Sequence, residues 1–163
     1  MQIKIDPSAL IYWYNNNKRP LPFRSTKDPY KIWISETMLQ QTQVKTVIPF
    51  YKRWVDKLPT IESVAMTNID SLLKLWEGLG YYRRCQNFYY ASKIIVEKYK
   101  GVIPSDYESF RGLPGVGDYT AGAVLSISFG IPIPAIDGFV IRVLSRLYGF
   151  KLFTKFFDSF IYK

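Results

Sequence analysis

Residues 113–122 read Leu-Pro-Gly-Val-Gly-Asp-Tyr-Thr-Ala-Gly and are the stretch that decides the fold. Gly115 and Gly117 permit positive φ and close approach of a second backbone, so the pattern predicts a tight turn. A helix rich in small residues follows over about 118–129, and the unpaired N–H groups of its first turn form a natural phosphate site. Gly115, Val116 and Gly117 are therefore the candidate phosphate-binding hairpin. A short Gly-x-Gly taken alone favours an ordinary helix–helix turn instead.

The rest of the chain repeats one pattern, a helix followed by a short break, and no strand alternation persists. Asp-Pro pairs at 6–7 and 28–29 predict helix starts, and Pro49 predicts a kink or break in the helix over 44–57. Thr60, Ser105 and Asp137 are expected to cap later helices. The expected helices cover about 6–14, 29–42, 44–57, 69–76, 82–99, 105–111, 118–129 and 138–148. The fold class is all-α, and residues 151–163 are expected to form an amphipathic helix.

Glu36 lies on what should be the apolar face of its helix, between Ile32, Trp33 and Leu39. A carboxylate placed there loses water, which favours its protonated form and raises its pKa above the usual value of about 4.3. A general acid working near neutral pH needs such a shift. The alternative is a structural glutamate bonded to a neighbouring helix end.

Asp137 precedes Gly138 and the last expected helix. Its simplest role is an N-cap, which is worth about 1 kcal/mol. Its functional role would be a second carboxylate, kept ionised by the helix N-terminus and facing a growing positive charge. Glu36 and Asp137 together would form the acid-plus-anion pair used in glycoside cleavage.

The amino-acid composition limits the partners and metal sites that this chain can have. The 163 residues are 48% apolar and carry a formal net charge of +9, which indicates nucleic acid first and an acidic membrane surface second as partner. The segment 18–57 holds nine basic residues against three acidic ones. The chain has one cysteine, Cys85, and no histidine, which excludes an internal disulfide and a zinc site built on these residues. A soluble, reducing, cytoplasmic location is expected, because no signal peptide or membrane-spanning stretch is visible.

Two further segments could act on a base stack. Gln40, Gln41 and Thr42 offer neutral hydrogen-bonding groups, and the run Leu79-Gly80-Tyr81-Tyr82 places aromatic side chains beside glycines. Inserted side chains can offset the few kcal/mol that unstacking costs. Helix-end glutamines and core tyrosines are the simpler alternatives.

Together these residues resemble the helix-hairpin-helix DNA glycosylases, most closely the MutY-type adenine DNA glycosylases, over about residues 8–149. The resemblance is strongest in DPYKIWISETMLQQTQVKTVIPFYKRW, LWEGLGYYRR, LPGVGDYTAGAVLSISFG and IDGFVIRVLSRL. It implies a six-helix barrel domain and a second helical lobe. The expected division is an N-terminal helix and basic loop (1–26), the barrel domain (27–130, with the hairpin at 113–122) and the start of the second lobe (131–163).

The resemblance also implies roles for single residues. Glu36 would protonate a flipped adenine, Asp137 would stabilise the oxocarbenium-like sugar, and Tyr119 stands where adenine glycosylases often carry a tyrosine. Related endonuclease III-like enzymes carry an attacking lysine at the position of Tyr119, so a monofunctional glycosylase is expected. The residues that match the family's adenine pocket and the segments that invade the helix are Arg24, Leu39, Gln41, Thr42, Leu79 and Tyr81.

The chain departs from the family pattern at several positions. Phe139 and Ile141 replace a common Asn and Lys beside Asp137, and Phe23 replaces a common Trp. The family continues into four cysteines that hold a [4Fe–4S] cluster, whereas this chain has only Cys85. A C-terminally truncated form without the iron–sulfur portion, without a cofactor of its own and without a metal site is therefore expected.

The expected substrate is double-stranded DNA with adenine opposite guanine or 8-oxoguanine, bound by a monomer at the bacterial nucleoid. Two other functions stay open from the sequence. One is a DNA-binding remnant that no longer cleaves, and the other is an endonuclease III-like glycosylase with lyase activity.

Overall fold

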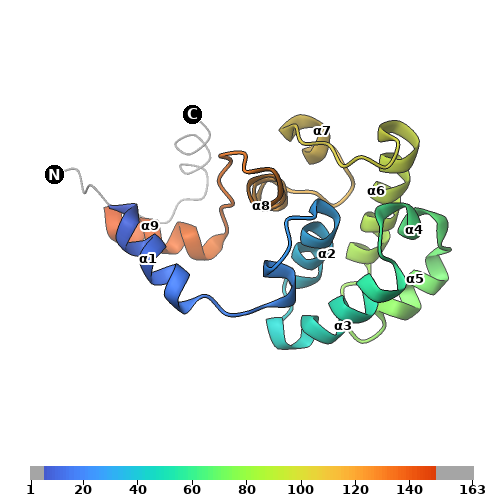
Figure 1. The fold of residues 1–163 in the computed structure, drawn as a ribbon, viewed down its shortest axis with the longest axis horizontal. Helices are drawn as coiled ribbons and strands as arrows, with labels where there is room; N and C mark the ends of the chain where they lie inside the picture. The colour runs from blue at the N-terminus through green and yellow to red at the C-terminus, as the bar shows by residue number, and fades with distance from the viewer. Residues whose placement is uncertain (1–5, 150–163) are drawn as a thin grey trace. The chain divides into compact units, whose positions relative to one another are not determined.

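The computed structural model describes residues 6–149, and in this range the chain is helical with no β-strand (Figure 1). The all-α prediction is confirmed. The helices are α1 (Pro7–Asn17), the 3-10 turn η1 (Pro22–Arg24), α2 (Pro29–Leu39), α3 (Val44–Lys57), α4 (Ile61–Met66), α5 (Ile69–Trp76), α6 (Arg83–Tyr99), α7 (Tyr107–Arg111), α8 (Asp118–Phe129) and α9 (Gly138–Tyr148). The amphipathic helix expected over 151–163 lies outside the described residues.

The chain divides into two compact units. The large unit comprises residues 21–135 and contains η1 and the helices from α2 to α8. The small unit is formed by residues 1–20 and 136–163 and contains α1 and α9.

Several helix starts follow the predicted caps. The Asp28 carboxylate accepts hydrogen bonds from the backbone N–H groups of Tyr30 and Lys31, and Thr60 accepts one from Ser63. The expected cap at Ser105 is wrong by one residue. Asp106 caps α7 instead, because its carboxylate accepts from the Ser109 N–H at 2.8 Å, and a carboxylate is the stronger acceptor.

Other helix ends also differ from the prediction. α1 continues three residues past Tyr14, because the side-chain amides of Asn16 and Asn17 donate to backbone carbonyls one turn back. α2 ends at Leu39 rather than near residue 42. Pro49 lies inside α3 without breaking it, since only one backbone N–H is missing from the ladder.

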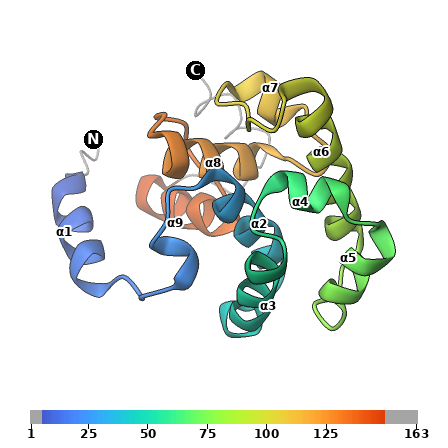
Figure 2. The ribbon, with the colours of Figure 1, turned by 45° about the vertical axis from the view of Figure 1, so that its right-hand side comes forward.

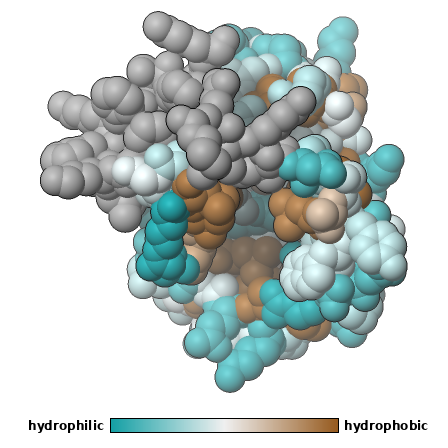
Figure 3. Space-filling model, turned by 90° about the vertical axis from the view of Figure 1, so that its left-hand side faces the viewer, coloured by the Kyte–Doolittle hydropathy of each residue, from teal (hydrophilic) through white to brown (hydrophobic). Residues whose placement is uncertain are grey.

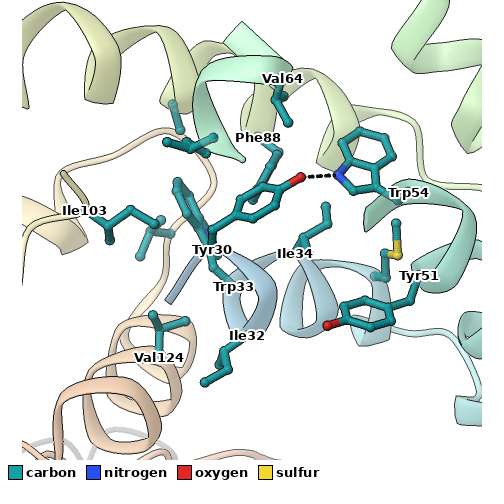
Figure 4. Close-up of a cluster of buried hydrophobic side chains, with 14 of the residues drawn as sticks. Tyr30, Ile32, Trp33, Ile34, Tyr51, Trp54, Val64, Phe88, Ile103 and Val124 are labelled. Carbon is teal, nitrogen blue, oxygen red and sulfur yellow. Dashed lines mark hydrogen bonds between the residues drawn. The ribbon is translucent and has the colours of Figure 1, made fainter. Parts of the chain in front are cut away.

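Large aromatic side chains form the centre of the large unit (Figure 4). The Trp33 ring packs against Phe88 with centroids 4.6 Å apart and edge-on to Phe110 at 5.1 Å. The Tyr30 hydroxyl accepts a hydrogen bond from Trp54 Nε1 at 3.0 Å and donates to the Leu58 carbonyl. Burying each such side chain contributes about 1.5–3 kcal/mol, so this cluster fixes the position of α2.

The central element of the large unit is α2. It packs against α3, α6 and α8, and Figures 1 and 2 both show it between α8 and α3. Nearly all of its residues from Tyr30 to Met38 are buried. A polar side chain on this helix is therefore held by rigid surroundings.

The small unit exposes apolar side chains. No residue of α1 is buried, and its Trp13 side chain is 59% exposed. On α9, Phe139 is 67% exposed.

In the space-filling view of Figure 3, hydrophobic surface lies among hydrophilic side chains. No helix within residues 6–149 combines the length and apolar composition needed to cross a membrane.

Candidate active site and DNA-binding surface

Glu36 lies in the last full turn of α2 and is half-buried. Its neighbours along the helix are buried, but their polar atoms are satisfied inside it: the Ser35 hydroxyl donates to the Ile32 carbonyl, and the Thr37 hydroxyl donates to the Trp33 carbonyl. Glu36 is the acidic residue of α2, and its carboxyl group is only partly buried although the residues on either side of it are buried.

Tyr119 contacts this carboxyl group directly. It lies in the first turn of α8, and its hydroxyl donates to Glu36 Oε2 at 3.2 Å. A second link joins the same two regions, since Gln40 Nε2 donates to the Thr120 hydroxyl at 3.4 Å. The structure therefore brings together two of the three predicted catalytic residues, which are 83 positions apart in the sequence.

Burial raises the pKa of the Glu36 carboxyl above its ordinary value. The hydrogen bond from Tyr119 and the positive charge of Arg24 both act against this shift, because they stabilise the ionised form. Loss of water is the larger effect. Glu36 thus keeps its proton to a higher pH than a solvated glutamate, as the sequence predicted.

The position of Arg24 is set by its neighbour. Arg24 closes the short η1 turn and is exposed, whereas the preceding Phe23 is buried. The Phe23 ring packs edge-on against Tyr51 with centroids 5.5 Å apart. Phe23 therefore fills the core position at which the glycosylases that the sequence resembles commonly carry a tryptophan. It anchors the turn that carries Arg24.

The turn between α7 and α8 requires glycine at position 115. Gly115 has φ of +77°, and a Cβ there would lie 2.8 Å from the Cβ of Asn87 on α6. Val116 is buried and anchors the turn in the core. Gly117 is the N-cap of α8 and has no side chain that could cap the helix, so the start of α8 is open to the approach of an anion.

An ion pair braces this turn. Arg111 Nε lies against the Asp118 carboxylate, and Arg111 Nη1 donates to the Val116 carbonyl at 3.0 Å. The Tyr107 hydroxyl also donates to Asp118, at 3.0 Å. The guanidinium thereby offsets the negative charge that Asp118 places at the start of α8.

The segments predicted to enter a base stack form two loops. The α2–α3 loop (residues 40–43) exposes Gln41, and the α5–α6 loop (residues 77–82) exposes Tyr81. Leu79 lies in the hydrophobic core with 5% of its surface exposed. Leu39 and Thr42 are half-buried at the end of α2 and just beyond it. In this structure, the Leu79 side chain packs into the core under the α5–α6 loop and does not face the solvent.

A small cavity lies between the end of α2 and the α7–α8 turn. Its volume of about 30 Å³ is enough for an ordered water molecule. It is lined by Trp33, Thr37, Gln40, Arg84, Asn87, Phe88, Pro114 and Gly115.

Arg84 is the functional candidate that sequence reasoning missed. Its guanidinium reaches the α2–α3 loop and the α5–α6 loop together. A signal existed in the sequence, because Arg83 and Arg84 begin a helix, where positive charge is unfavourable.

Asp137 is the N-cap of α9, as predicted. Its carboxylate accepts from the backbone N–H groups of Phe139 at 3.0 Å and Val140 at 2.8 Å. Its pairing with Glu36 stays a prediction, since the two residues belong to different units of the chain.

The side chains present do not fit a four-cysteine cluster. The sequence contains one cysteine, and Cys85 is buried in the core. No group of three or more metal-ligating side chains gathers within residues 6–149.

Comparison of the fold identifies the class of protein. The chain is similar to the solved structure of a thermostable thymine-DNA glycosylase, with a TM-score of 0.80 and 28% identity over 85% of this chain and 64% of that one. It is also similar to endonuclease III in a non-covalent complex with DNA, with a TM-score of 0.73 and 25% identity over 89% of this chain and 70% of that one. The helix-hairpin-helix glycosylase fold is thereby confirmed.

The family follows from the sequence. Residues 34–155 match the HhH-GPD superfamily of base excision DNA repair proteins, and the chain belongs to this family. The adenine DNA glycosylase of Buchnera aphidicola subsp. Baizongia pistaciae is 43% identical over 156 residues, which are 95% of this chain and 44% of the relative. The human adenine DNA glycosylase is 42% identical over 148 residues, which are 85% of this chain and 27% of the relative. The chain thus spans less than half the length of these relatives.

Proposed function

We propose that the chain is the catalytic core of an adenine DNA glycosylase, which hydrolyses the N-glycosidic bond of adenine opposite guanine or 8-oxoguanine. The observation that carries this proposal is the half-buried carboxyl of Glu36, whose pKa is raised by burial and which accepts a hydrogen bond from a phenol. The similarity to curated adenine DNA glycosylases supports the choice of base.

The proposed reaction begins with protonation. Glu36 donates its proton to a ring nitrogen of the extruded adenine while the bond from that base to C1′ of the sugar breaks. The bonding electrons leave with adenine, which departs as a neutral base. General acid assistance of this kind is typically worth about 10²–10⁴ in rate.

Asp137 has the complementary role in this scheme. Its carboxylate stabilises the positive charge that develops on the sugar. A water oxygen then bonds to C1′ and the water loses a proton, which replaces the one that Glu36 gave to adenine and leaves an abasic site. The N-cap geometry supports this role, since the backbone N–H groups of Phe139 and Val140 hold the carboxylate in one orientation.

Tyr119 makes the enzyme monofunctional. A phenol stands at the position where the family resemblance places a lysine in the lyase branch, so no amine attacks the sugar there. The hydroxyl instead orients the Glu36 carboxyl through the 3.2 Å hydrogen bond.

Double-stranded DNA is the proposed partner, bound by a monomer at the nucleoid in the cytoplasm. The α8 N-terminus and the turn at 115–117 hold a backbone phosphate, while Arg24 lies beside the adenine pocket. Gln41, Thr42 and Tyr81 enter the duplex, with Leu39 and Leu79 beneath them. The net charge of +9 supports an anionic partner.

The lobes proposed for this enzyme follow the family resemblance. Residues 27–130 form the barrel domain, and residues 1–26 and 131–163 belong to the second lobe. The division of the chain at residues 20 and 135 supports this assignment.

Single-turnover release of adenine from a duplex with adenine opposite 8-oxoguanine tests the proposal. The unmodified chain should release adenine, and Glu36→Gln should release none while binding the duplex as well as before. Borohydride should trap no covalent adduct, because Tyr119 provides no amine. Release that persists in Glu36→Gln would overturn the proposed mechanism.

A second candidate, DNA binding without base release, is favoured by one observation. Phe139 is 67% exposed two residues after Asp137, where a polar partner for that carboxylate would be expected. Tight binding of the duplex by the unmodified chain without release of adenine would select this candidate.

A further inference from the structure

Arg84 caps the C-terminal end of the helix that carries Glu36. Its Nη1 atom donates to the carbonyl oxygens of Thr37 at 3.0 Å and Met38 at 2.9 Å, and also to that of Gln40. These carbonyls lie at the end of α2, where they lack partners within the helix. The guanidinium therefore fixes the point at which the chain leaves α2.

The same guanidinium binds the α5–α6 loop. Its Nη2 atom donates to the Gly80 carbonyl at 3.1 Å and to the Thr42 hydroxyl at 3.2 Å. Weaker bonds of 3.4 Å run to the carbonyls of Leu79 and Tyr81. A guanidinium has five N–H donors in a fixed plane, so this single side chain can hydrogen-bond to both loops and fix their relative position.

Both loops contain a strained residue. Gln41 has φ of +57° and Tyr81 has φ of +48°, and neither is a glycine. Within residues 6–149, Lys100 is the third residue of this kind. Such conformations cost about 1–3 kcal/mol each and persist where surrounding contacts impose them. Arg84 bonds to both neighbours of Gln41 and to the carbonyl of Tyr81 itself.

The location of Arg84 is costly for the helix that bears it. It lies in the first turn of α6, where the helix dipole opposes a positive charge. Partial burial lowers the pKa of the guanidinium. Its carbon Cζ lies 5.4 Å from the centroid of the Trp76 ring and 5.3 Å from that of Tyr81, which offsets part of this cost. The stability of α6 alone does not explain an arginine here.

We propose that Arg84 is a positioning residue that holds the α2–α3 and α5–α6 loops as one rigid wedge for entry into the DNA base stack. This inference rests on the proposed function. The two side chains that the strained backbone turns outward, Gln41 and Tyr81, are both exposed, and the latter is 61% exposed. A wedge that is already ordered loses little conformational entropy when it displaces a base.

Arg84→Lys is the decisive variant, because it keeps the positive charge and removes the fork. A lysine carries its three donors on a single atom, so it cannot reproduce the bonds that Nε, Nη1 and Nη2 of the arginine make to the two loops. Arg83→Lys is the matched control, since Arg83 is the adjacent arginine of α6 and is exposed. It makes the same exchange of guanidinium for ammonium at a side chain that bonds to neither loop.

The first measurement is base unstacking. 2-Aminopurine replaces the target adenine in a duplex opposite guanine, and its fluorescence rises when the base leaves the stack. The unmodified chain and Arg83→Lys should produce the same rise. Arg84→Lys should lose most of it while its Kd for the duplex changes less than about threefold.

The second measurement separates the wedge from the chemistry. Single-turnover release of adenine is compared on a fully paired mispair duplex and on a duplex whose flanking pairs are mismatched and already open. Arg84→Lys should be slower than the unmodified chain by about tenfold or more on the first duplex. On the second, its deficit should shrink at least fivefold, since the base stack no longer resists entry.

Amide hydrogen exchange tests the structural premise. In Arg84→Lys, exchange should accelerate in residues 40–43 and 77–82 together, while α3 and α8 stay protected. Faster exchange throughout the large unit would mean that Arg84 only stabilises the fold, and would overturn the inference. Normal 2-aminopurine unstacking by Arg84→Lys, or an equal rate deficit on both duplexes, would overturn it too.

Failure of the proposed function gives a different result. In that case the unmodified chain releases no adenine from either duplex. The unstacking and exchange measurements do not need base release, so they still decide whether Arg84 orders the two loops.

Discussion

Replacing Tyr119 by phenylalanine should extend adenine release to higher pH. The change removes the donor that lies 3.2 Å from Glu36 Oε2 and keeps the ring. A hydrogen bond to a charged group is worth about 1.5–3 kcal/mol. This hydrogen bond is longer than the usual O–H···O distance of about 2.7–2.8 Å, and the Tyr119 side chain is 38% exposed. Its contribution therefore lies at the lower end of this energy range.

A loss of about 1.4 kcal/mol changes the protonation equilibrium about tenfold. The direction follows from the ionic form involved. The Tyr119 hydroxyl stabilises ionised Glu36, so its removal favours the protonated carboxyl and raises the pKa further. On the alkaline limb of the pH–rate profile, where only a small fraction of Glu36 carries a proton, the variant should be faster by up to about tenfold.

The assay is single-turnover release of adenine across the pH range in which the folded state is stable. Tyr90→Phe serves as the control, because Tyr90 is an exposed phenol on α6. Its profile should match that of the unmodified chain. An alkaline limb that stays in place, or moves to lower pH, in Tyr119→Phe would refute the assignment of Glu36 as the acid that Tyr119 contacts.

Four further predictions concern stability and reactivity. Glu36→Gln should be more stable than the unmodified chain once the pH exceeds the ordinary glutamate pKa, because burial then opposes ionisation of Glu36 in the folded state alone; urea unfolding at pH 4 and 7.5 measures this gain. Gly115→Ala should lose about 1–3 kcal/mol and bind duplex DNA weakly, whereas Gly117→Ala, with no atom near its added Cβ, should lose less than half of that. Tyr30→Phe should lose about 1–3 kcal/mol in the same unfolding assay, since a buried carbonyl loses its donor. Cys85 should resist iodoacetamide until the chain unfolds, because burial raises its pKa to about 12.

Local chemistry determined the parts of the fold that the sequence predicted well. The caps at Asp28, Thr60 and Asp137 are each set by a side chain and an N–H two or three residues away. The end of α1 was missed because Asn17 bonds backward onto the helix and extends it. Ser105 and Asp106 are both good capping residues in the sequence, and only the structure shows that the Asp106 side chain points at the open N–H groups.

In the candidate site, too, local features were predictable from the sequence and long-range contacts were not. The burial of Glu36 followed from the apolar period around it, because α2 packs on three sides. The contact with Tyr119 required knowledge of which helices meet, and the family resemblance, not the periodicity, suggested that residue. The two arginines at the start of α6 are visible in the sequence, but the partners of Arg84 are not, because they lie up to 47 positions away and are mostly backbone carbonyls.

The half-buried acid on α2 belongs to a chain without histidine. Histidine is the side chain that ordinarily changes charge between about pH 5 and 8, so its usual background is missing from any spectroscopic titration of this protein. The remaining groups that titrate at lower pH are mostly the other carboxyls among the 13 aspartates and glutamates. Infrared difference spectra in the carboxyl C=O region, recorded with and without the Gln replacement, subtract these and follow a single glutamate as it gains and loses its proton, with no label attached.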